Sequence, residues 1–144
     1  MHVRIQRLDP GLQLPVAQHD DDAGYDLCAR VDAVLEPGGG RALVPTGMAV
    51  AIPPGCAGFI QPRSGLALEH GVTCLNTPGL VDAGYRDELK VLLVNTDPHA
   101  RYEVHRGDRI AQLVIQRVEL VEWLEVGDLG ESERSVEGWG STGR

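Results

Sequence analysis

The stretch from residue 76 to residue 90, Asn-Thr-Pro-Gly-Leu-Val-Asp-Ala-Gly-Tyr-Arg-Asp-Glu-Leu-Lys, combines residue types that could do chemistry on a small planar ligand. Asp82 offers one acid or base and Tyr85 a flat surface, and a Pro-Gly or Ala-Gly turn precedes each of them. Interpreted as a β-hairpin, the stretch also exposes backbone amides. The alternative is a tight hairpin in which Asp82 caps a turn and Tyr85 is core, and on these residues alone that alternative is favoured.

A second group of residues suits phosphate. Arg63, Ser64 and Gly65 stand at the start of a predicted short helix, with Ser64 as its N-cap and Gly71 just past its end. Helix N-termini present unpaired N–H groups to anions, and an arginine adds a two-pronged donor. The alternative is a capped helix with a solvated arginine.

Two more polar side chains lie in apolar surroundings. Gln112, in the stretch 106–112, is on an otherwise apolar strand, so its amide needs a partner, which could be a ligand or a neighbouring backbone. Asp108 and Arg109 could pair with each other. Asp26, in Ala-Gly-Tyr-Asp-Leu at 23–27, could orient waters on a divalent cation, because Mg²⁺ keeps most of its water and uses few carboxylates.

The elements that position these residues are predicted to be short strands. Eighteen Gly and nine Pro separate apolar runs in a chain of 144 residues, which suits one domain with many turns. Such spacing, with one helical turn, predicts an antiparallel barrel or a jelly roll. Strands are expected at 3–8, 42–52 (two short strands or one bulged strand), 56–61, 72–75, 88–95, 101–104, 109–118 and 120–125.

The C-terminal tail has a different character. From Gly127 the apolar pattern stops, and the chain ends in a glycine-rich stretch that carries Trp139. A frayed terminus is one interpretation. An arm that makes a functional contact is the other, because an exposed tryptophan is usually kept for contact.

Charge and cysteine content narrow the possible partners. A net charge of −8 argues against a nucleic-acid duplex and against an anionic membrane surface. Three cysteines without a Cys-x-x-Cys spacing predict reduced thiols in a cytoplasmic protein. The N-terminus has no apolar core of a signal peptide, and no apolar run approaches the length of a membrane span.

Five motifs, in this order and at these spacings, resemble those of the trimeric dUTP pyrophosphatases (dUTPases). They are Ala-Gly-Tyr-Asp-Leu at 23–27, Pro-Arg-Ser-Gly-Leu-Ala at 62–67, the stretch 76–90, Arg-Gly-Asp-Arg-Ile-Ala-Gln at 106–112, and the stretch 134–143. The resemblance runs nearly from end to end of the chain.

The resemblance implies an all-β protomer, a jelly-roll-like distorted β-barrel of the β-clip type with one short helix. Residues 1–126 would form this single domain, and residues 127–144 an arm that closes over the active site. Three protomers would form a homotrimer whose sites lie between subunits. The implied reaction is hydrolysis of dUTP to dUMP and pyrophosphate with Mg²⁺, by attack of water on the α-phosphate. It keeps uracil out of DNA and supplies dUMP for dTMP synthesis.

The resemblance also implies a role for individual residues. Asp82 would activate the attacking water and hold the 3′-hydroxyl, and Tyr85 would pack under the deoxyribose, where a 2′-hydroxyl would clash. Asp26 would contact Mg²⁺ through water. The remaining substrate contacts are assigned to the uracil (Asn76, the Leu80 and Val81 backbone, the main chain near Lys90), to the phosphates (Arg63, Ser64, Gly65, Gln112) and to the arm (Arg134, Ser141 and Thr142 on phosphate, Trp139 stacked on the base).

The sequence departs from the family pattern in the third and fifth motifs. Asp87 stands where the family usually has Gly, and aspartate tolerates left-handed backbone better than most residues. Ser135 and Glu137 replace two usual glycines, and Trp139 replaces the usual Phe or His. Trp139 should stack at least as well, whereas Ser135 and Glu137 stiffen the arm and bring a carboxylate close to the triphosphate. They predict weaker closure of the arm, and Glu137→Gly is then expected to lower the KM.

Two rival functions fit parts of the same pattern. A dCTP deaminase has a similar third motif, but Leu92 stands where that family has its catalytic Glu. A non-catalytic nucleotide-binding or regulatory trimer would explain the altered arm, yet it would not need Asp82, Arg63, Ser64, Gln112 and Arg134 together.

Overall fold

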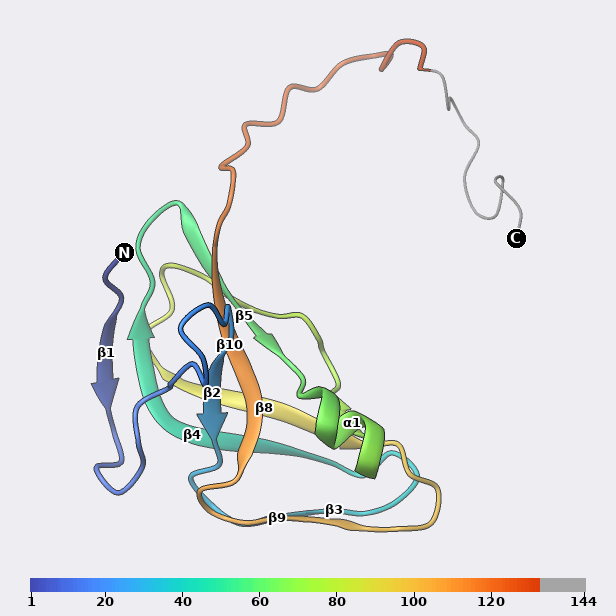
Figure 1. The fold of residues 1–144 in the computed structure, drawn as a ribbon. Helices are drawn as coiled ribbons and strands as arrows, with labels where there is room; N and C mark the ends of the chain where they lie inside the picture. The colour runs from blue at the N-terminus through green and yellow to red at the C-terminus, as the bar shows by residue number, and fades with distance from the viewer. Residues whose placement is uncertain (133–144) are drawn as a thin grey trace.

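The computed structural model describes residues 1–132, which form short antiparallel strands and one short helix (Figure 1). The elements are β1 (Arg4–Arg7), β2 (Tyr25–Cys28), β3 (Ala33–Leu35), β4 (Arg41–Ala51), β5 (Cys56–Gln61), α1 (Ser64–His70), β6 (Val72–Cys74), β7 (Gly79–Val81), β8 (Glu88–Asn95), β9 (Tyr102–Val104) and β10 (Arg109–Arg117). The predicted strands are confirmed at most positions, and β2, β3 and β7 are additional.

The strands form two four-stranded sheets and a two-stranded ribbon. One sheet has the order β1-β4-β8-β6, the other β2-β10-β5-β7, and β3 pairs with β9. All these pairings are antiparallel. The main apolar core draws buried side chains from both sheets, among them Val44, Val91 and Leu93 from the first and Leu27 and Leu113 from the second. The fold is therefore mainly β, as predicted, with its core between the sheets.

Strand β4 is one long strand with a bulge, which was one of the two forms predicted. Its pairing with β8 shifts register between Pro45 and Ala49. Gly47 lies in this bulge with φ of +73°, a left-handed conformation that glycine adopts without steric cost. A Cβ at Gly47 would lie 2.9 Å from the Cβ of Asp9, so the bulge also brings the chain after β1 close to β4.

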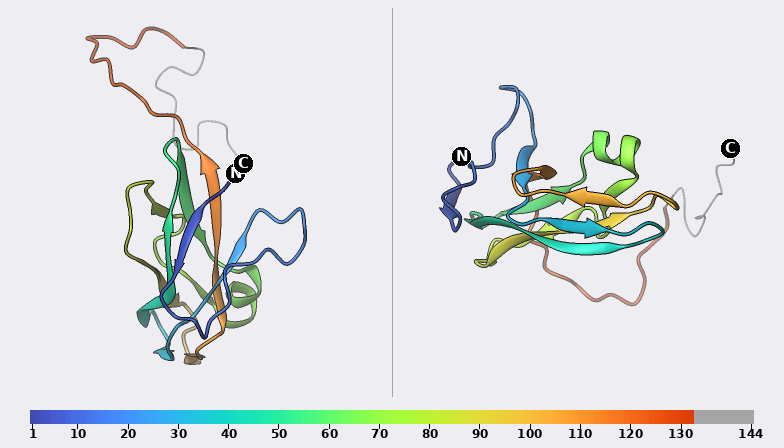
Figure 2. Two further views of the ribbon diagram at one scale, coloured as in Figure 1. Left: turned by 90° about the vertical axis from the view of Figure 1, so that its left-hand side faces the viewer. Right: turned by 90° about the horizontal axis from the view of Figure 1, so that it is seen from below.

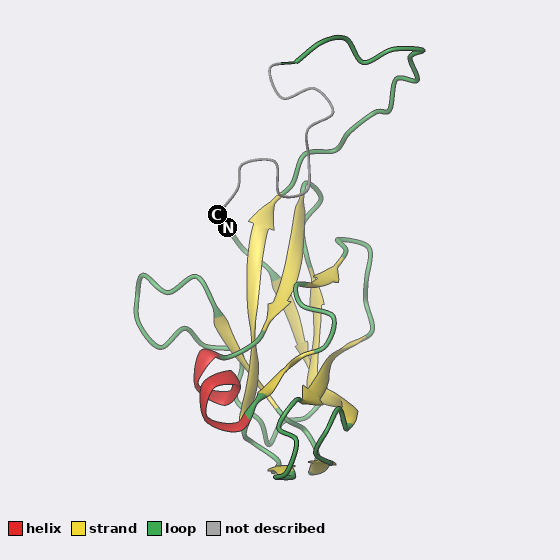
Figure 3. Ribbon diagram, turned by 90° about the vertical axis from the view of Figure 1, so that its right-hand side faces the viewer, coloured by secondary structure: helices red, strands yellow, loops and turns green. Residues whose placement is uncertain are grey.

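Helix α1 begins at Ser64, one residue earlier than predicted. Its N-cap is Arg63, which makes no side-chain cap hydrogen bond, so the expectation that Ser64 caps the helix is wrong. Gly71 ends the helix in the left-handed conformation with φ of +64°, as its position predicted. The helix has no buried residue and lies on the outside of the sheets (Figure 3).

The chain after β10 leaves the body of the fold (Figures 1 and 2). The strand expected at 120–125 is wrong for residues 1–132, because no described strand lies beside that stretch to pair with it. Its apolar side chains are instead open to solvent, including Leu120, Trp123 and Leu124 at 83%, 90% and 84% exposure. Among the described residues, no helix is long and apolar enough to cross a membrane.

Candidate active site

The stretch 76–90 crosses from one sheet to the other. Strand β7 pairs with β5, whereas β8 pairs with β4 and β6, so the expectation of a β-hairpin is wrong. Its two halves contribute to different sheets, and residues 82–87 connect them. Strand β7 is also an edge strand, which leaves one row of its backbone N–H and C=O groups without a strand partner among residues 1–132.

A pocket of about 390 Å³ opens where this stretch passes between the sheets. Its volume lies within the range of small-molecule sites. Six residues predicted for the site line it: Asn76, Leu80, Val81, Asp82, Tyr85 and Lys90. The rest of its wall is mainly apolar and comes from Leu43, Ile60, Gly79, Leu89 and Leu92.

Asp82 and Tyr85 both face solvent in this pocket. Tyr85 is 39% exposed, so the alternative in which its ring is core is wrong. The Tyr85 N–H donates to the Asp82 carbonyl over 3.0 Å, and the Tyr85 hydroxyl donates to the Glu88 carbonyl over 3.0 Å. These two bonds hold Tyr85 at its backbone and at its ring hydroxyl, and the exposed Asp82 lines the same pocket.

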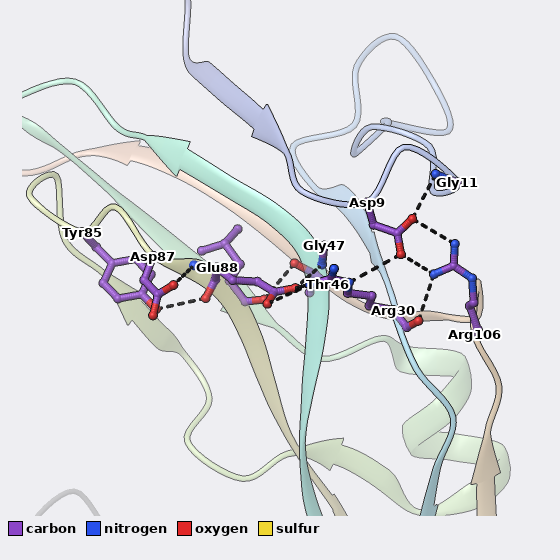
Figure 4. Close-up of polar contacts among 10 residues, drawn as sticks. Asp9, Gly11, Arg30, Thr46, Gly47, Tyr85, Asp87, Glu88 and Arg106 are labelled. Carbon is purple, nitrogen blue, oxygen red and sulfur yellow. Dashed lines mark hydrogen bonds and ion pairs between the residues drawn. The ribbon is translucent and has the colours of Figure 1, made fainter.

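Asp87, which stands where the family pattern has Gly, is the last residue of the connection between the two sheets. Its Oδ1 accepts the Glu88 N–H over 2.7 Å (Figure 4). The side chain therefore binds a backbone group at the start of β8, which is how short polar residues stabilise turns. That aspartate preserves the turn of the family at this position stays a prediction.

Two of the residues predicted for phosphate, Arg63 and Gln112, lie next to Asp26. The Asp26 carboxylate is 4% exposed. Its Oδ1 lies 3.5 Å from Arg63 Nε, and its Oδ2 accepts from Arg109 Nη1 over 3.1 Å and from Gln18 Nε2 over 2.9 Å. Arg109 thus pairs with Asp26 and not with Asp108. The guanidinium groups of Arg63 and Arg109 compensate the charge of the buried Asp26 carboxylate, and this carboxylate holds the Arg63 side chain in place.

Gln112 lies beside this group. Strand β10 places it opposite Asp26 on β2 and opposite Gln61 on β5. A Cβ at Gly24 would lie 2.6 Å from Gln112 Oε1, so the absence of a side chain at Gly24 makes room for the amide. Ser64 and Gly65 are exposed at the start of α1. None of Arg63, Ser64, Gly65 and Gln112 lines the pocket of Asp82.

The predicted arm contacts lie outside the described residues. They are Arg134, Trp139, Ser141 and Thr142, together with the departures Ser135 and Glu137. The structure therefore brings together the residues assigned to base and sugar, gathers those assigned to phosphate elsewhere on the same chain, and leaves the arm assignments as predictions.

Comparison with known proteins gives the family. The family model described as dUTPase matches residues 12–143. This chain belongs to the dUTPase family. It is 55% identical to the deoxyuridine 5′-triphosphate nucleotidohydrolase of Nocardia farcinica over 141 residues, which is 98% of this chain and 85% of that protein.

Solved dUTPases share the fold. The dUTPase of Staphylococcus bacteriophage 80alpha with dUpNHpp superposes with a TM-score of 0.88 at 28% identity, covering 99% of both chains. A D95N variant of the dUTPase from phage phi11 of S. aureus, described with a structural Mg(II) ion, has a TM-score of 0.80 at 26% identity and covers 90% of this chain and 99% of that one.

The donors of this dUTPase do not by themselves form a metal centre. Among residues 1–132, no group of three or more His, Cys, Asp or Glu side chains could hold a metal ion. Asp26 is buried with its oxygens already paired, so it does not fit a direct ligand role. A contact through water, as the resemblance implies, stays a prediction.

The cysteines of this dUTPase do not take part in the site. All three are buried and free, and burial raises the pKa of Cys28 and raises that of Cys74 to about 11. Thiols with raised pKa values stay protonated at neutral pH and are poor nucleophiles.

Reasoning from sequence missed two kinds of residue in the site. Leu43, Ile60, Leu89 and Leu92 line the pocket, but an apolar strand residue that faces a pocket looks the same in sequence as one that faces the core. Glu88, whose carbonyl accepts the Tyr85 hydroxyl, was also missed. The sequence signal that could have identified it is its position directly after Asp87, where the turn becomes a strand.

Proposed function

We propose that this chain hydrolyses dUTP to dUMP and pyrophosphate. The observation that carries the proposal is the pocket between the sheets, where Asp82 and Tyr85 stand beside the free backbone edge of β7. Membership of the dUTPase family supports the same reaction.

The uracil ring binds against β7 in this proposal. Backbone N–H and C=O groups of Leu80 and Val81 match the donor and acceptors of uracil, with the Asn76 amide nearby. Cytosine would place its amino group against a donor, and buried polar groups left unpaired reject a wrong ligand by about 10⁴-fold or more. The apolar wall formed by Leu43, Ile60 and Leu92 covers the ring.

Asp82 acts as the general base. Its exposed carboxylate takes a proton from the water that attacks the α-phosphate, and it accepts the 3′-hydroxyl of the sugar. Tyr85 lies under the deoxyribose and leaves no room for a 2′-hydroxyl. Because little covalent chemistry is asked of the protein, positioning and charge stabilisation do most of the work.

The phosphates bind to Arg63, Ser64, Gly65 and Gln112 of another subunit. That these residues lie apart from the Asp82 pocket on one chain supports a site shared between copies of the chain. The exposed apolar side chains of residues 118–132 also support assembly, because monomeric proteins rarely expose contiguous apolar stretches. We propose a homotrimer of jelly-roll-like barrels of the β-clip type, each comprising residues 1–126.

The arm, residues 127–144, closes over the bound substrate. Arg134, Ser141 and Thr142 hold distal phosphates and Trp139 stacks on the base. Asp26 would help to hold Mg²⁺ through water, and the ion would supply charge neutralisation at the phosphates. Three free, buried cysteines support a cytoplasmic location.

One assay tests the reaction. The chain is incubated with dUTP, dCTP or UTP and Mg²⁺, and pyrophosphate, dUMP and ammonia are followed. We expect pyrophosphate and dUMP from dUTP alone. Ammonia from dCTP would indicate a deaminase, against which Leu92 in the pocket wall already argues. Tight dUTP binding without product would indicate a non-catalytic nucleotide-binding protein.

A further inference from the structure

Glu88, the first residue of β8, anchors the segment that carries Asp82 and Tyr85 (Figure 4). Its Oε1 accepts the Gly47 N–H over 2.7 Å and lies 3.2 Å from Arg30 Nη1, which also lies 3.4 Å from Oε2. The Glu88 side chain is only 13% exposed. A charged acceptor with a backbone donor and a guanidinium partner is a strong fixed point, because charge-assisted hydrogen bonds are stronger than neutral ones.

The Tyr85 ring depends directly on this fixed point. Its hydroxyl donates to the Glu88 carbonyl, while its own N–H donates to the Asp82 carbonyl. Asp87 Oδ1 holds the Glu88 N–H from the other side. The backbone of Glu88 is therefore bound at its N–H and at its C=O, and its side chain is bound to the neighbouring strand. A shift of Glu88 would move the ring.

Arg30 extends the anchor away from the pocket. Its Nε lies 3.5 Å from Asp9 Oδ2, and Arg106 donates to Asp9 Oδ1 over 3.0 Å and to the Arg30 carbonyl over 2.9 Å. Arg106 holds the pKa of Asp9 below its usual range, so this carboxylate stays ionised. The Gly47 carbonyl accepts the Asp9 N–H over 3.2 Å. These contacts join the chain after β2, the β4 bulge and the chain after β1 to the start of β8.

None of these anchoring residues touches the pocket. Glu88, Arg30, Asp9 and Arg106 are absent from its lining, whereas Tyr85 is part of it. Any effect they have on substrate must therefore pass through residues that line the pocket, and of these Tyr85 donates its hydroxyl hydrogen bond directly to Glu88.

We propose that Glu88, with Arg30 as its charge partner, is a positioning residue that fixes Tyr85 and thereby sets how strictly the sugar pocket rejects a 2′-hydroxyl. This inference rests on the proposed function, in which Tyr85 lies under the deoxyribose. Removing the carboxylate leaves the Gly47 N–H without its acceptor and Arg30 Nη1 without its contact to Glu88, so the start of β8 shifts. Displacements of about 1 Å are enough to change the rate of an enzyme greatly.

The test compares dUTP with UTP. Glu88→Ala and Glu88→Gln are assayed for kcat and KM on both nucleotides. In Glu88→Ala we expect the ratio of kcat/KM for dUTP to that for UTP to fall about tenfold, mainly because the KM for UTP falls. Glu88→Gln should retain most of the ratio, because its amide oxygen still accepts the Gly47 N–H. Glu103→Gln is the matched control, since Glu103 pairs with Arg101 at the surface.

A second pair of variants separates positioning from stability. Tyr85→Phe removes the hydroxyl that donates to the Glu88 carbonyl, so it should lower the dUTP to UTP ratio through the same contact as Glu88→Ala. The loss in the double variant should therefore be smaller than the sum of the two single losses. A ratio unchanged in Glu88→Ala and Glu88→Gln with a lowered Tm, or additive effects in the double variant, would overturn the proposal. If Glu88→Ala does not fold, Tyr85→Phe alone tests the link, because it removes the hydroxyl that donates to the Glu88 carbonyl. An unchanged ratio in Tyr85→Phe would then overturn the proposal. A wild-type chain that fails to hydrolyse dUTP would instead refute the proposed function.

Discussion

Asp82 differs from the other acids of this chain in where it stands. It is exposed inside a pocket beside an aromatic ring, whereas Asp26 is buried between two arginines and Asp9 is paired with Arg106. Only the first arrangement leaves a carboxylate free to accept a proton from water. A chain with 21 acidic residues thus offers few candidates for the base once their partners are known.

We expect Asp82→Asn to lower kcat for dUTP by about 10²–10⁴-fold, the usual contribution of a general base. Binding of dUpNHpp should stay close to that of the wild type, because asparagine keeps the shape and can still bond the 3′-hydroxyl. Steady-state assay and calorimetry measure the two quantities. Asp20→Asn, in the exposed loop before β2, is the control. Retained turnover in Asp82→Asn would remove Asp82 from the role of base.

The β4 bulge does more than relieve a register shift. The Gly47 N–H donates to Glu88 Oε1, and the Gly47 carbonyl accepts the N–H groups of Leu8 and Asp9. Three chain segments therefore meet at this glycine. No sequence pattern marks such a junction, since Pro45-Thr46-Gly47 within an apolar run predicts only a break or a bulge.

Gly47→Ala should destabilise the fold by about 1–3 kcal/mol, because it combines left-handed strain with a clash at 2.9 Å from the Asp9 Cβ. Gly55→Ala is a matched control, since Gly55 has φ of +78° but no heavy atom within 4 Å of an added Cβ. Urea unfolding of both variants separates the clash from the backbone strain. Equal losses would show that the close approach of Asp9 to β4 is unimportant.

The sequence predicted the short strands of this fold well and their partners poorly. Strands 56–61 and 88–95 match β5 and β8 to the residue, because apolar runs and turn residues mark strand ends locally. Which strands pair depends on contacts between distant segments, so the stretch 76–90 was taken for a hairpin when its halves join different sheets. Similarly, local composition placed Asp26 and Arg63 in motifs, but only the fold shows that they meet.

On a single chain the proposed site is incomplete and an apolar stretch is uncovered, and assembly would resolve both. The side chains of Trp123 and Leu124, in the segment that follows β10, are exposed to solvent. Packing against a second copy would bury them, with a free energy proportional to the apolar area covered.

We expect the wild-type chain to have the mass of a trimer by light scattering and Trp123→Ser/Leu124→Ser to shift it towards the monomer. The dUTPase activity should fall with the loss of trimer. Leu68→Ser is the control, because Leu68 is equally exposed, at 88%, but lies on α1. A wild-type mass for the double variant would mean that other surfaces hold the assembly together.

The position of β10 has a mechanical consequence for that assembly. It lies inside its sheet, hydrogen-bonded to β2 along one edge and to β5 along the other, and the C-terminal segment is its direct continuation. A tension applied to that segment would load these bonds together in shear, whereas an edge strand such as β1 can be peeled away one bond at a time. A partner subunit that binds the C-terminal segment therefore pulls on a strand that is hydrogen-bonded on both sides. We expect the contact between the subunits to break before β10 is pulled out of its sheet.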